Sequence, residues 1–244
     1  MTTKSMGAEG FRWFIGVVED RDDPLKLGRM RVRANHYHED KTLIPTDDLP
    51  WALPMSSIVS SSLQQIGMSP TGIQVGSTVI GFFVDGNECQ IPVILGTMHG
   101  IPEEGHDVAA LARETQSLTK STLGPEPSSA YGAKYPFNKT MTTESGHAIE
   151  VDDTPGKERL HVYHKTGTYT EVNEKGRRVC KIVNDDYEIV AGNKEVFIKG
   201  NVNIVVKGNV KMQIDGKYDV NVGGTCNITS GGEMRLKAPK IYLN

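Results

Sequence analysis

The stretch GNVNIVVKGNVKMQIDGKYDVNVGG, residues 200–224, decides how the C-terminal half of this chain folds. Glycine returns at every eighth position in it, and the same spacing extends on both sides. Asn184 stands at the one skipped position, and asparagine tolerates a positive φ better than most residues that carry a Cβ. The spacing predicts a sharp backbone turn every eight residues, in a conformation that a Cβ would penalise. The predicted glycine corners are Gly176, Gly192, Gly200, Gly208, Gly216, Gly224 and Gly232.

The residues between the corners alternate in polarity. Most apolar side chains fall at even positions, where Lys194 is an exception, whereas the odd positions are mostly polar, as at Asn201, Lys207 and Asp215. Strict alternation is typical of an extended strand with one buried face. The residues predicted to lie on that buried face are Ile182, Val190, Val196, Ile198, Val202, Ile204, Val206, Val210, Met212, Ile214, Tyr218, Val220, Val222, Ile228, Met234 and Leu236.

The length of the repeat determines how many chains the fold needs. One strand of about five or six residues and its corner use up the whole repeat. A three-sided coil closed by a single chain would need at least three such strands per repeat, so three chains must each supply one side. The repeat therefore predicts an intertwined, homotrimeric triple-stranded β-helix whose apolar faces meet in a common core. An antiparallel meander with coincidental glycines is the alternative.

The composition agrees with a chain that needs partners to bury its apolar surface. Hydrophobic residues make up 37% and aromatic residues 7% of the 244 residues, which is low for a single well-filled globule. The net charge of -3 does not favour a bulk nucleic-acid binder. Cys89, Cys180 and Cys226 lie far apart, in neither a disulfide nor a zinc pattern, which fits assembly in a reducing cytoplasm. The N-terminus lacks the apolar core of a signal peptide.

Three regions of the chain differ in residue composition and pattern. The predicted fold class is all-β. Short apolar runs broken by turn residues predict a small antiparallel barrel or sandwich within residues 1–103. Residues 104–140 are rich in Ser, Pro and Gly and predict a linker, with one possible short helix at Val108–Leu118. Residues 141–244 form the predicted needle, in which the octads begin near residue 176. The strands expected in the barrel lie near residues 13–18, 30–32, 79–84 and 91–95.

Several segments resemble one known family. The stretch WFIGVVEDRDDPLKLGRMRVR, residues 13–33, is similar to the start of the central spike proteins of T-even-like contractile-tail phages, and IPTDDLPW, residues 44–51, is similar as well. So are the shorter motifs at residues 75–82 and 94–97. The segments SGHAIEVDDTPG, from Ser145, and HVYHKTGTY, from His161, resemble the beginning of the β-helix in VgrG and phage spike proteins.

The resemblance implies an N-terminal OB-fold barrel, a trimeric needle and a structural, non-enzymatic role. It implies a spike in the tail baseplate of a virion, or of a related injection device, that caps the tail tube and pierces the host envelope. The T-even spike carries a lysozyme domain between barrel and needle, but only about 40 residues separate Gly100 from Thr140 here, too few for such a domain. VgrG proteins carry a hub domain before the barrel, so a separate trimeric hub protein is expected at this barrel.

The last residues of the chain break the alternation. Proline cannot donate to a ladder of strands, so the last regular strand is predicted to end near Pro239. The platform predicted beyond it consists of Ile241, Tyr242, Leu243 and Asn244. In the family such a platform lies under a separate PAAR-type tip protein that carries its own metal. The resemblance therefore implies a tip protein as a partner, and no metal or cofactor in this chain.

Two alternative functions depend on particular side chains. A spike-associated peptidoglycan hydrolase would need two carboxylates held about 5–10 Å apart. Glu103, Glu104 and Glu126 lie in or beside the predicted linker, so solvated charges are predicted and no catalytic residue is assigned. A single-stranded nucleic-acid-binding barrel would use a basic groove, and Arg29, Arg31 and Arg33 share one strand face. A solvated face or a protein contact is the preferred interpretation, with no nucleic acid as a partner.

The remaining polar motifs are predicted to be structural. His36 and His38 could chelate a metal, but they are expected in a surface loop after the strand at residues 30–34. His161 and His164 lie three apart in a strand-like segment and are therefore expected on opposite faces. The segment Asp152–Gly156 is typical of a turn between two strands, because it combines Asp, Pro and Gly.

Overall fold

The computed structural model describes residues 10–63, 66–99 and 127–242. The chain divides into two compact units, Met1–Ala110 and Leu111–Asn244, and each is taken by itself. The expected helix at Val108–Leu118 lies outside the described residues. Within the described residues, no helix has the length and hydrophobicity needed to cross a membrane.

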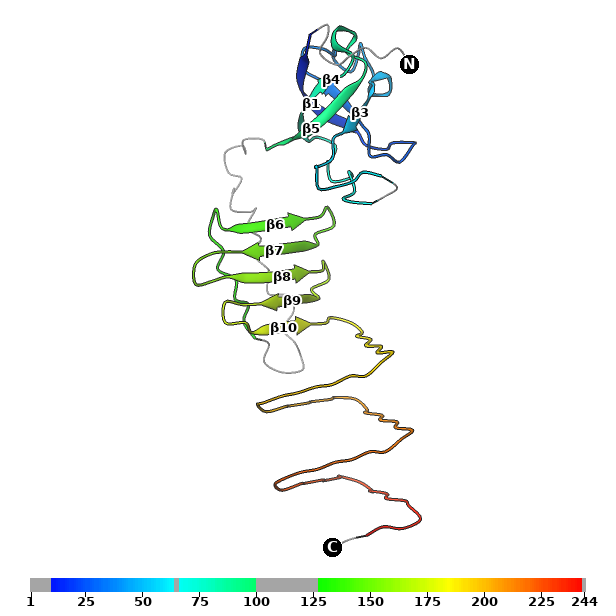
Figure 1. Cartoon of the computed structure of the whole chain (residues 1–244), viewed down its shortest axis with the longest axis vertical. Coiled ribbons are helices and arrows are strands. Elements are labelled where there is room, and N and C mark those ends of the chain that lie inside the picture. Colours follow the sequence, from blue (N-terminus) through cyan, green and yellow to red (C-terminus); the bar gives the residue numbers. More distant parts are fainter. Residues whose placement is uncertain (1–9, 64–65, 100–126, 243–244) are drawn as a thin grey trace. The chain divides into compact units, whose positions relative to one another are not determined.

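The first unit is a closed five-stranded barrel (Figure 1). Around the barrel the strands follow the order β1, β2, β3, β5, β4, and β4 pairs with β1 to close it. The predicted barrel is confirmed, although β3 and β5 pair in parallel, so the sheet is not purely antiparallel. The strands are β1 (Arg12–Asp20), β2 (Met30–Ala34), β3 (Trp51–Pro54), β4 (Thr78–Phe83) and β5 (Pro92–Met98), with short 3-10 turns η1 (Thr46–Asp48) and η2 (Gly86–Glu88).

Side chains of alternate residues fill the barrel. In β2, for example, Met30, Val32 and Ala34 are buried while the arginines between them face outward. Gly16 and Gly81 let strands approach one another, because a Cβ would lie 2.6 Å from the Arg33 carbonyl oxygen at Gly16 and 2.1 Å from the Val93 carbonyl oxygen at Gly81. The buried cluster consists of Phe14, Val18, Met30, Val32, Ala34, Ala52, Val79, Phe83 and Ile94.

The second unit begins with a five-stranded antiparallel meander in the order β10, β9, β8, β7, β6 (Figure 1). Glycines with positive φ occupy its hairpin turns, at Gly146, Gly156, Gly167 and Gly176. The turn predicted at Asp152–Gly156 is confirmed, because it joins β7 to β8. The strands are β6 (Asn138–Thr142), β7 (Ala148–Asp152), β8 (Arg159–Tyr163), β9 (Tyr169–Val172) and β10 (Arg178–Lys181).

Beyond β10 the chain is extended and bends at regular intervals. The bends fall at residues 183–184, 191–192, 199–200, 207–208, 215–216, 223–224 and 231–232, so a bend recurs every eight residues. Asn184 lies at a bend in the same way as the glycines. Residues 182–242 form no strand pair with one another, and Figure 1 draws them as an open trace from yellow to red.

The conformation expected at the corners is only partly correct. Gly176 has φ 74, as predicted. At Gly192 and the later corner glycines φ lies outside the positive range, and a Cβ at these positions would meet no atom of this chain within 4 Å. The expected positive φ is therefore wrong from Gly192 onward. Neither the backbone conformation nor the contacts within one chain therefore explain why glycine occurs at these corners.

The close packing at Gly81 leads to a prediction. Gly81→Ala should lower the free energy of unfolding of the barrel by about 1–3 kcal/mol, because the added methyl meets the Val93 backbone and the Phe14 ring. Gly96→Ala is the matched control, since nothing lies within 4 Å of its Cβ. Urea denaturation followed by tryptophan fluorescence measures both. Equal midpoints for the two variants would contradict this account of the barrel core.

Candidate functional site

The two faces of the β6–β10 sheet differ sharply in character. In β7, Ala148, Glu150 and Asp152 are buried, whereas Ile149 and Val151 are exposed. The same division continues in β8, where Arg159 and His161 are buried. One face thus holds charged groups out of water, while the opposite face presents apolar side chains to it. An exposed apolar face opposite a buried charged face indicates that the apolar face of this sheet is a contact surface.

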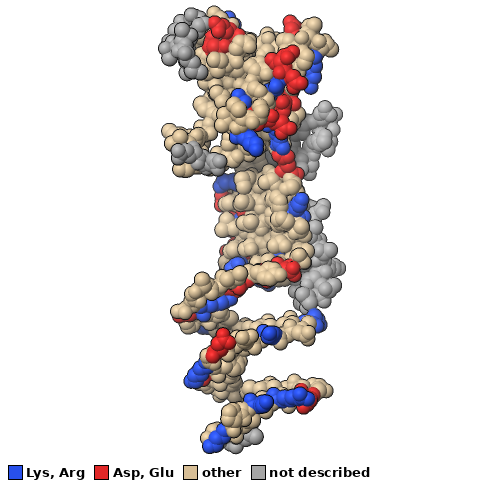
Figure 2. Space-filling model, turned by 90° about the vertical axis from the view of Figure 1, so that its right-hand side faces the viewer, with Lys and Arg blue, Asp and Glu red and all other residues tan. Residues whose placement is uncertain are grey.

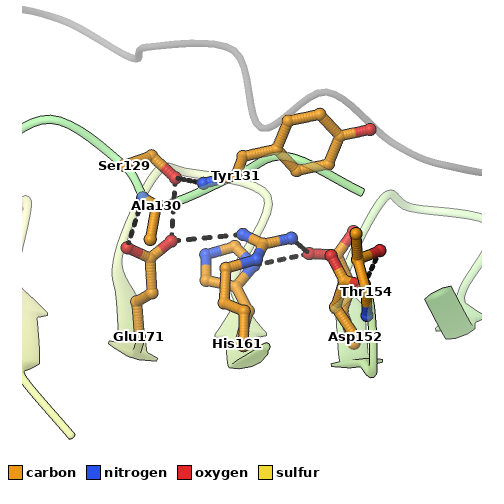
Figure 3. A network of polar contacts seen from close by, with 9 residues as sticks. Ser129, Ala130, Tyr131, Asp152, Thr154, His161 and Glu171 are labelled. Carbon is orange, nitrogen blue, oxygen red and sulfur yellow. Dashed lines mark hydrogen bonds and ion pairs between the residues drawn. The ribbon is translucent and has the colours of Figure 1, made fainter. Parts of the chain in front are cut away.

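A network of polar contacts occupies the covered face (Figure 3). Arg159 lies at its centre, and one Nη of its guanidinium binds Glu150 Oε2 while the other donates to Glu171 Oε2 at 3.1 Å. His161 Nδ1 lies 3.0 Å from the same oxygen of Glu150. The side chains of Glu150 and Arg159 are both 0% exposed. The network therefore joins three strands, β7, β8 and β9, through one buried guanidinium.

A short strap, residues 129–134, lies over this network. Ser129 Oγ and the Ala130 backbone N–H donate to the two carboxylate oxygens of Glu171, at 2.8 and 3.1 Å. The ring of Tyr131 lies 5.0 Å from the Arg159 guanidinium carbon, a cation–π distance. At the far end of the strap, the Lys134 backbone N–H donates to Thr154 Oγ1 at 2.9 Å. The strap thus seals the polar face of the sheet.

The chemistry of this cluster is that of a structural clamp. Burial alone raises the pKa of Glu171, but hydrogen bonds from Ala130, Ser129 and Arg159 outweigh it and hold that pKa below its usual value. The buried atoms Glu150 Oε1, Asp152 Oδ2 and Arg159 Nε have no hydrogen-bond partner within the described residues. Because Glu150 and Arg159 are shut off from solvent, their charges hold the strands in place rather than act on a substrate.

The opposite, apolar face is ordered in rows. The register of the strands places Met141, Ile149, Val162, Thr170 and Cys180 side by side across all five strands. The side chains of Met141, Ile149 and Val162 are 57, 43 and 56% exposed. At one edge of this face the rings of His147 and His164 lie 4.4 Å apart, beside an open apolar hollow.

The apolar face of the sheet continues into the octads. Cys180 in β10 has the same parity as Ile182, the first residue of the predicted needle core. All the predicted core residues from Ile182 to Leu236 are exposed in the single chain, from 39% at Ile182 to 79% at Ile204. None of these predicted core residues is therefore buried within one chain. Among the predicted platform residues, Ile241 and Tyr242 are exposed, while Leu243 and Asn244 lie outside the described residues.

The arginine stripe on the barrel is confirmed as one face but is occupied by carboxylates. Arg29 pairs with Asp23 at 2.6 Å, and Arg33 pairs with Glu19 at 2.8 Å. The hydrogen bond from Arg33 lowers the pKa of Glu19 to about 2. Arg31 lies 3.6 Å from both Asp20 and Asp47. Figure 2 shows acidic and basic side chains interspersed on the barrel.

Trp51 completes the stripe from the neighbouring strand. The guanidinium carbons of Arg29 and Arg31 lie 5.4 and 4.7 Å from the centre of its ring. A tryptophan in this position could stack on a base, but here both of its cationic neighbours contact it. The stripe is therefore engaged within the barrel, although Arg31 Nε has no hydrogen-bond partner among the described residues.

The histidines lie as the sequence indicates. His36 and His38 follow β2 in a turn, and the Ala34 backbone N–H donates to His38 Nδ1 at 3.0 Å. Partial burial lowers the pKa of His38. His161 is buried and His164 exposed, so the expected opposite faces are confirmed. Among the described residues, no group of three or more His, Cys, Asp or Glu side chains could hold a metal. Glu103, Glu104 and Glu126 lie outside them.

Sequence reasoning missed the buried network. A signal was present, since Glu150 and Asp152 alternate with Ile149 and Val151. Alternation reveals that the strand has two faces, but it does not say that the charged face is the covered one. Only the strap, which precedes the sheet in the chain, shows which face is sealed.

These features define an all-β protein whose N-terminal part is a closed barrel and whose C-terminal half is a repeat rather than a globule. A family model described as the Gp5 N-terminal OB domain matches residues 33–112. "Protein Gp5" of Vibrio phage KVP40 is 36% identical over an alignment 265 residues long, which covers 80% of this chain and 63% of that protein. "Pre-baseplate central spike protein Gp5" of Enterobacteria phage T4 is 49% identical over 81 residues, 30% of this chain and 14% of that protein.

The comparisons confirm the resemblance found in the sequence. This chain is a relative of the Gp5 central spike proteins of T4-like phages, and its barrel is a Gp5-type OB domain. The chain spans less than two thirds of the length of either curated relative.

The buried clamp leads to a prediction. Arg159→Ala should lower the free energy of unfolding by about 3–5 kcal/mol, because it leaves Glu150 and Glu171 buried without a cation. Lys139→Ala is the control in the same sheet, since the Lys139–Asp153 pair is exposed and should contribute only about 0–1 kcal/mol. Denaturation followed by circular dichroism compares them. A clamp without a structural role would give two variants of similar stability.

Proposed function

We propose that this chain is the structural central spike of a phage tail baseplate or of a related contractile injection device. As a homotrimer it caps the tail tube and pierces the host envelope when the tail contracts. The relationship to a named pre-baseplate central spike protein is the observation that carries the proposal. The one-sided sheet and the regularly bent chain support it, because both need partner chains to become stable.

The bent chain itself supports a triple-stranded assembly. A β-helix made by one chain would pair each turn with the next, but residues 182–242 form no strand pair with one another. Their backbone N–H and C=O groups form open edges, which attract other strands. Strands from two further chains would fill these edges. Partner strands would also explain the glycine corners, which neither φ nor contacts within this chain require.

The apolar face supplies the driving force for the assembly. Each octad places about three apolar side chains on the even face, and full burial of each would contribute about 1.5–3 kcal/mol. The face extends from Met141 on β6 to Leu236 near the C-terminus, with Asp186, Glu188 and Lys194 as charged residues at even positions between them. We infer that the trimeric needle begins at the sheet, with three covered polar faces outside and three apolar faces inside.

The two ends of the spike have different partners in this proposal. The N-terminal barrel binds a separate trimeric hub protein of the baseplate. The C-terminal platform, Ile241 to Asn244, carries a PAAR-type tip protein, because exposed apolar side chains at an open strand end are a liability in water. The spike assembles in the host cytoplasm, is carried in the virion baseplate and contacts the host outer membrane only in passage.

Two alternatives receive less support. A peptidoglycan hydrolase needs a pair of carboxylates in an accessible cleft, whereas the carboxylates that cluster in the described sheet are sealed under the strap. A single-stranded nucleic-acid-binding barrel needs free cations, whereas Arg29, Arg31 and Arg33 are paired with carboxylates. We therefore propose a non-enzymatic spike that binds no nucleic acid, metal or cofactor.

Two adjacent residues of one octad test the trimer. Ile204 and Val205 are 79 and 60% exposed in the single chain, but only Ile204 has the parity of the proposed core. Ile204→Asp should abolish the trimer, since three carboxylates would meet in an apolar core, and Val205→Asp should leave it intact. Light scattering at micromolar concentration gives the mass. A monomeric parent, or equal behaviour of the two variants, would sink the proposal.

Deleting residues 241–244 tests the proposed tip. The truncated chain should remain trimeric but lose binding of a tip protein, because the octads end before the deleted residues. Truncation loses the platform while every bend up to residue 232 stays in place. Co-purification with the tip protein and light scattering measure the two effects separately. Retained tip binding would show that the platform lies elsewhere.

A further inference from the structure

The barrel carries an uncharged apolar wall on its outer surface. Trp13 on β1, Phe82 on β4, Val93 on β5 and Leu53 on β3 are direct cross-strand neighbours. Phe11 extends this row, with its ring 5.0 Å from Trp13 and 5.1 Å from Phe82, and Phe82 itself is only 8% exposed. Trp13 is 51% exposed, although tryptophan is usually well buried. These five residues are called the outer wall.

The loop between β3 and β4 carries a second exposed apolar feature. Ile58 is 100% and Val59 84% exposed at a turn closed by the Ser60 backbone N–H, which donates to Ser57 O at 2.8 Å. Ser60 Oγ accepts from the Met68 backbone N–H at 2.9 Å. The hydroxyl groups of the loop thus bind within it, while the aliphatic side chains point out. Ile58 and Val59 form a projecting knob.

The charge pattern of the sequence sets both features apart. No Asp, Glu, Lys or Arg occurs from Leu49 to Val84, although such residues make up 23% of the chain. The run contains the knob and the β4 part of the wall. On the other side of the barrel, acidic and basic side chains alternate around β2. An uncharged knob and an uncharged wall suit one another, because neither buries an unpaired charge in the contact.

We propose that the knob of one barrel docks on the outer wall of the barrel in the next copy of this chain, so that three barrels close a ring. The inference rests on the trimer of the proposed function and deepens it. A three-fold assembly requires two different patches on each subunit, one for each neighbour. Each barrel offers two, and the needle would hold the three copies together at high local concentration.

The residue types of the knob favour this occupant. A membrane-binding loop combines aromatic side chains with Lys or Arg at the lipid surface. Residues 55–63 contain neither, and consist of Ser with Met, Ile, Val and Leu. Aliphatic side chains against the Phe11, Trp13 and Phe82 rings are a common pairing at protein interfaces.

Photo-crosslinking in the full-length protein tests the proposal. Benzoylphenylalanine replaces Val59, the trimer is irradiated, and boiled samples are run on a denaturing gel. We expect covalent dimers and trimers, with mass spectrometry joining position 59 to peptides that contain Trp13 or Phe82. The same photoprobe at Leu43, which is 69% exposed on another barrel loop, should give no covalent multimer. Adding Trp13→Ser to the Val59 probe should remove most of the covalent product without changing the solution mass.

The outcomes separate this inference from the proposed function. A monomeric mass before irradiation would overturn the trimer and the inference together. A trimer that yields no covalent multimer overturns the inference alone and leaves the knob to a different protein. Crosslinks confined to one chain, or joined to peptides away from the wall, overturn it as well.

Discussion

Backbone N–H and C=O groups along residues 182–242 have no strand partner within the chain, and the rest of this protein depends on that constraint. An extended chain that bends every eight residues cannot pair with itself, because its own next turn does not lie alongside it. In the proposed trimer its N–H and C=O groups and its apolar even face find partners in the two other chains. The same requirement reaches back into the β6–β10 sheet, where the apolar row from Met141 to Cys180 continues into Ile182.

The covered side of that sheet solves the opposite problem. In the proposed trimer the apolar face of this sheet contacts the other chains, so only the opposite face can stabilise the sheet within one chain. Here the outer face uses charge, because Arg159 ties Glu150 to Glu171 and the strap closes over them. Separating such a buried pair leaves an uncompensated charge and is costly, so the network disfavours any other register of these strands. A strand that slipped by one residue would expose the network and bury apolar side chains on the wrong face.

Much of this could be predicted from the sequence, because periodicity is a local property. The period of eight predicted the bends from Asn184 onward, whereas the strands predicted by the period of two in the octads do not form within one chain. The expected positive φ at Gly192 and later corners was wrong. The spacing of the glycines predicts where the chain bends, but it does not determine the backbone dihedral angles of each bend. The clamp was not foreseen, since the contact between Ser129 and Glu171 joins residues 42 apart that share no pattern. The parallel pairing of β3 with β5 was missed for a similar reason, because the residue pattern of a strand does not show which distant strand it pairs with.

The strap also has a mechanical meaning. It meets Glu171 on β9, Arg159 on β8 and Thr154 after β7, before the chain enters β6. Tension that arrives from the preceding residues is thereby divided among several strands at the same moment. Contacts that are loaded in parallel must all break at the same time, whereas contacts that are loaded in series break one after another. The sheet can thus take up a sudden pull at its first residues without peeling from its edge.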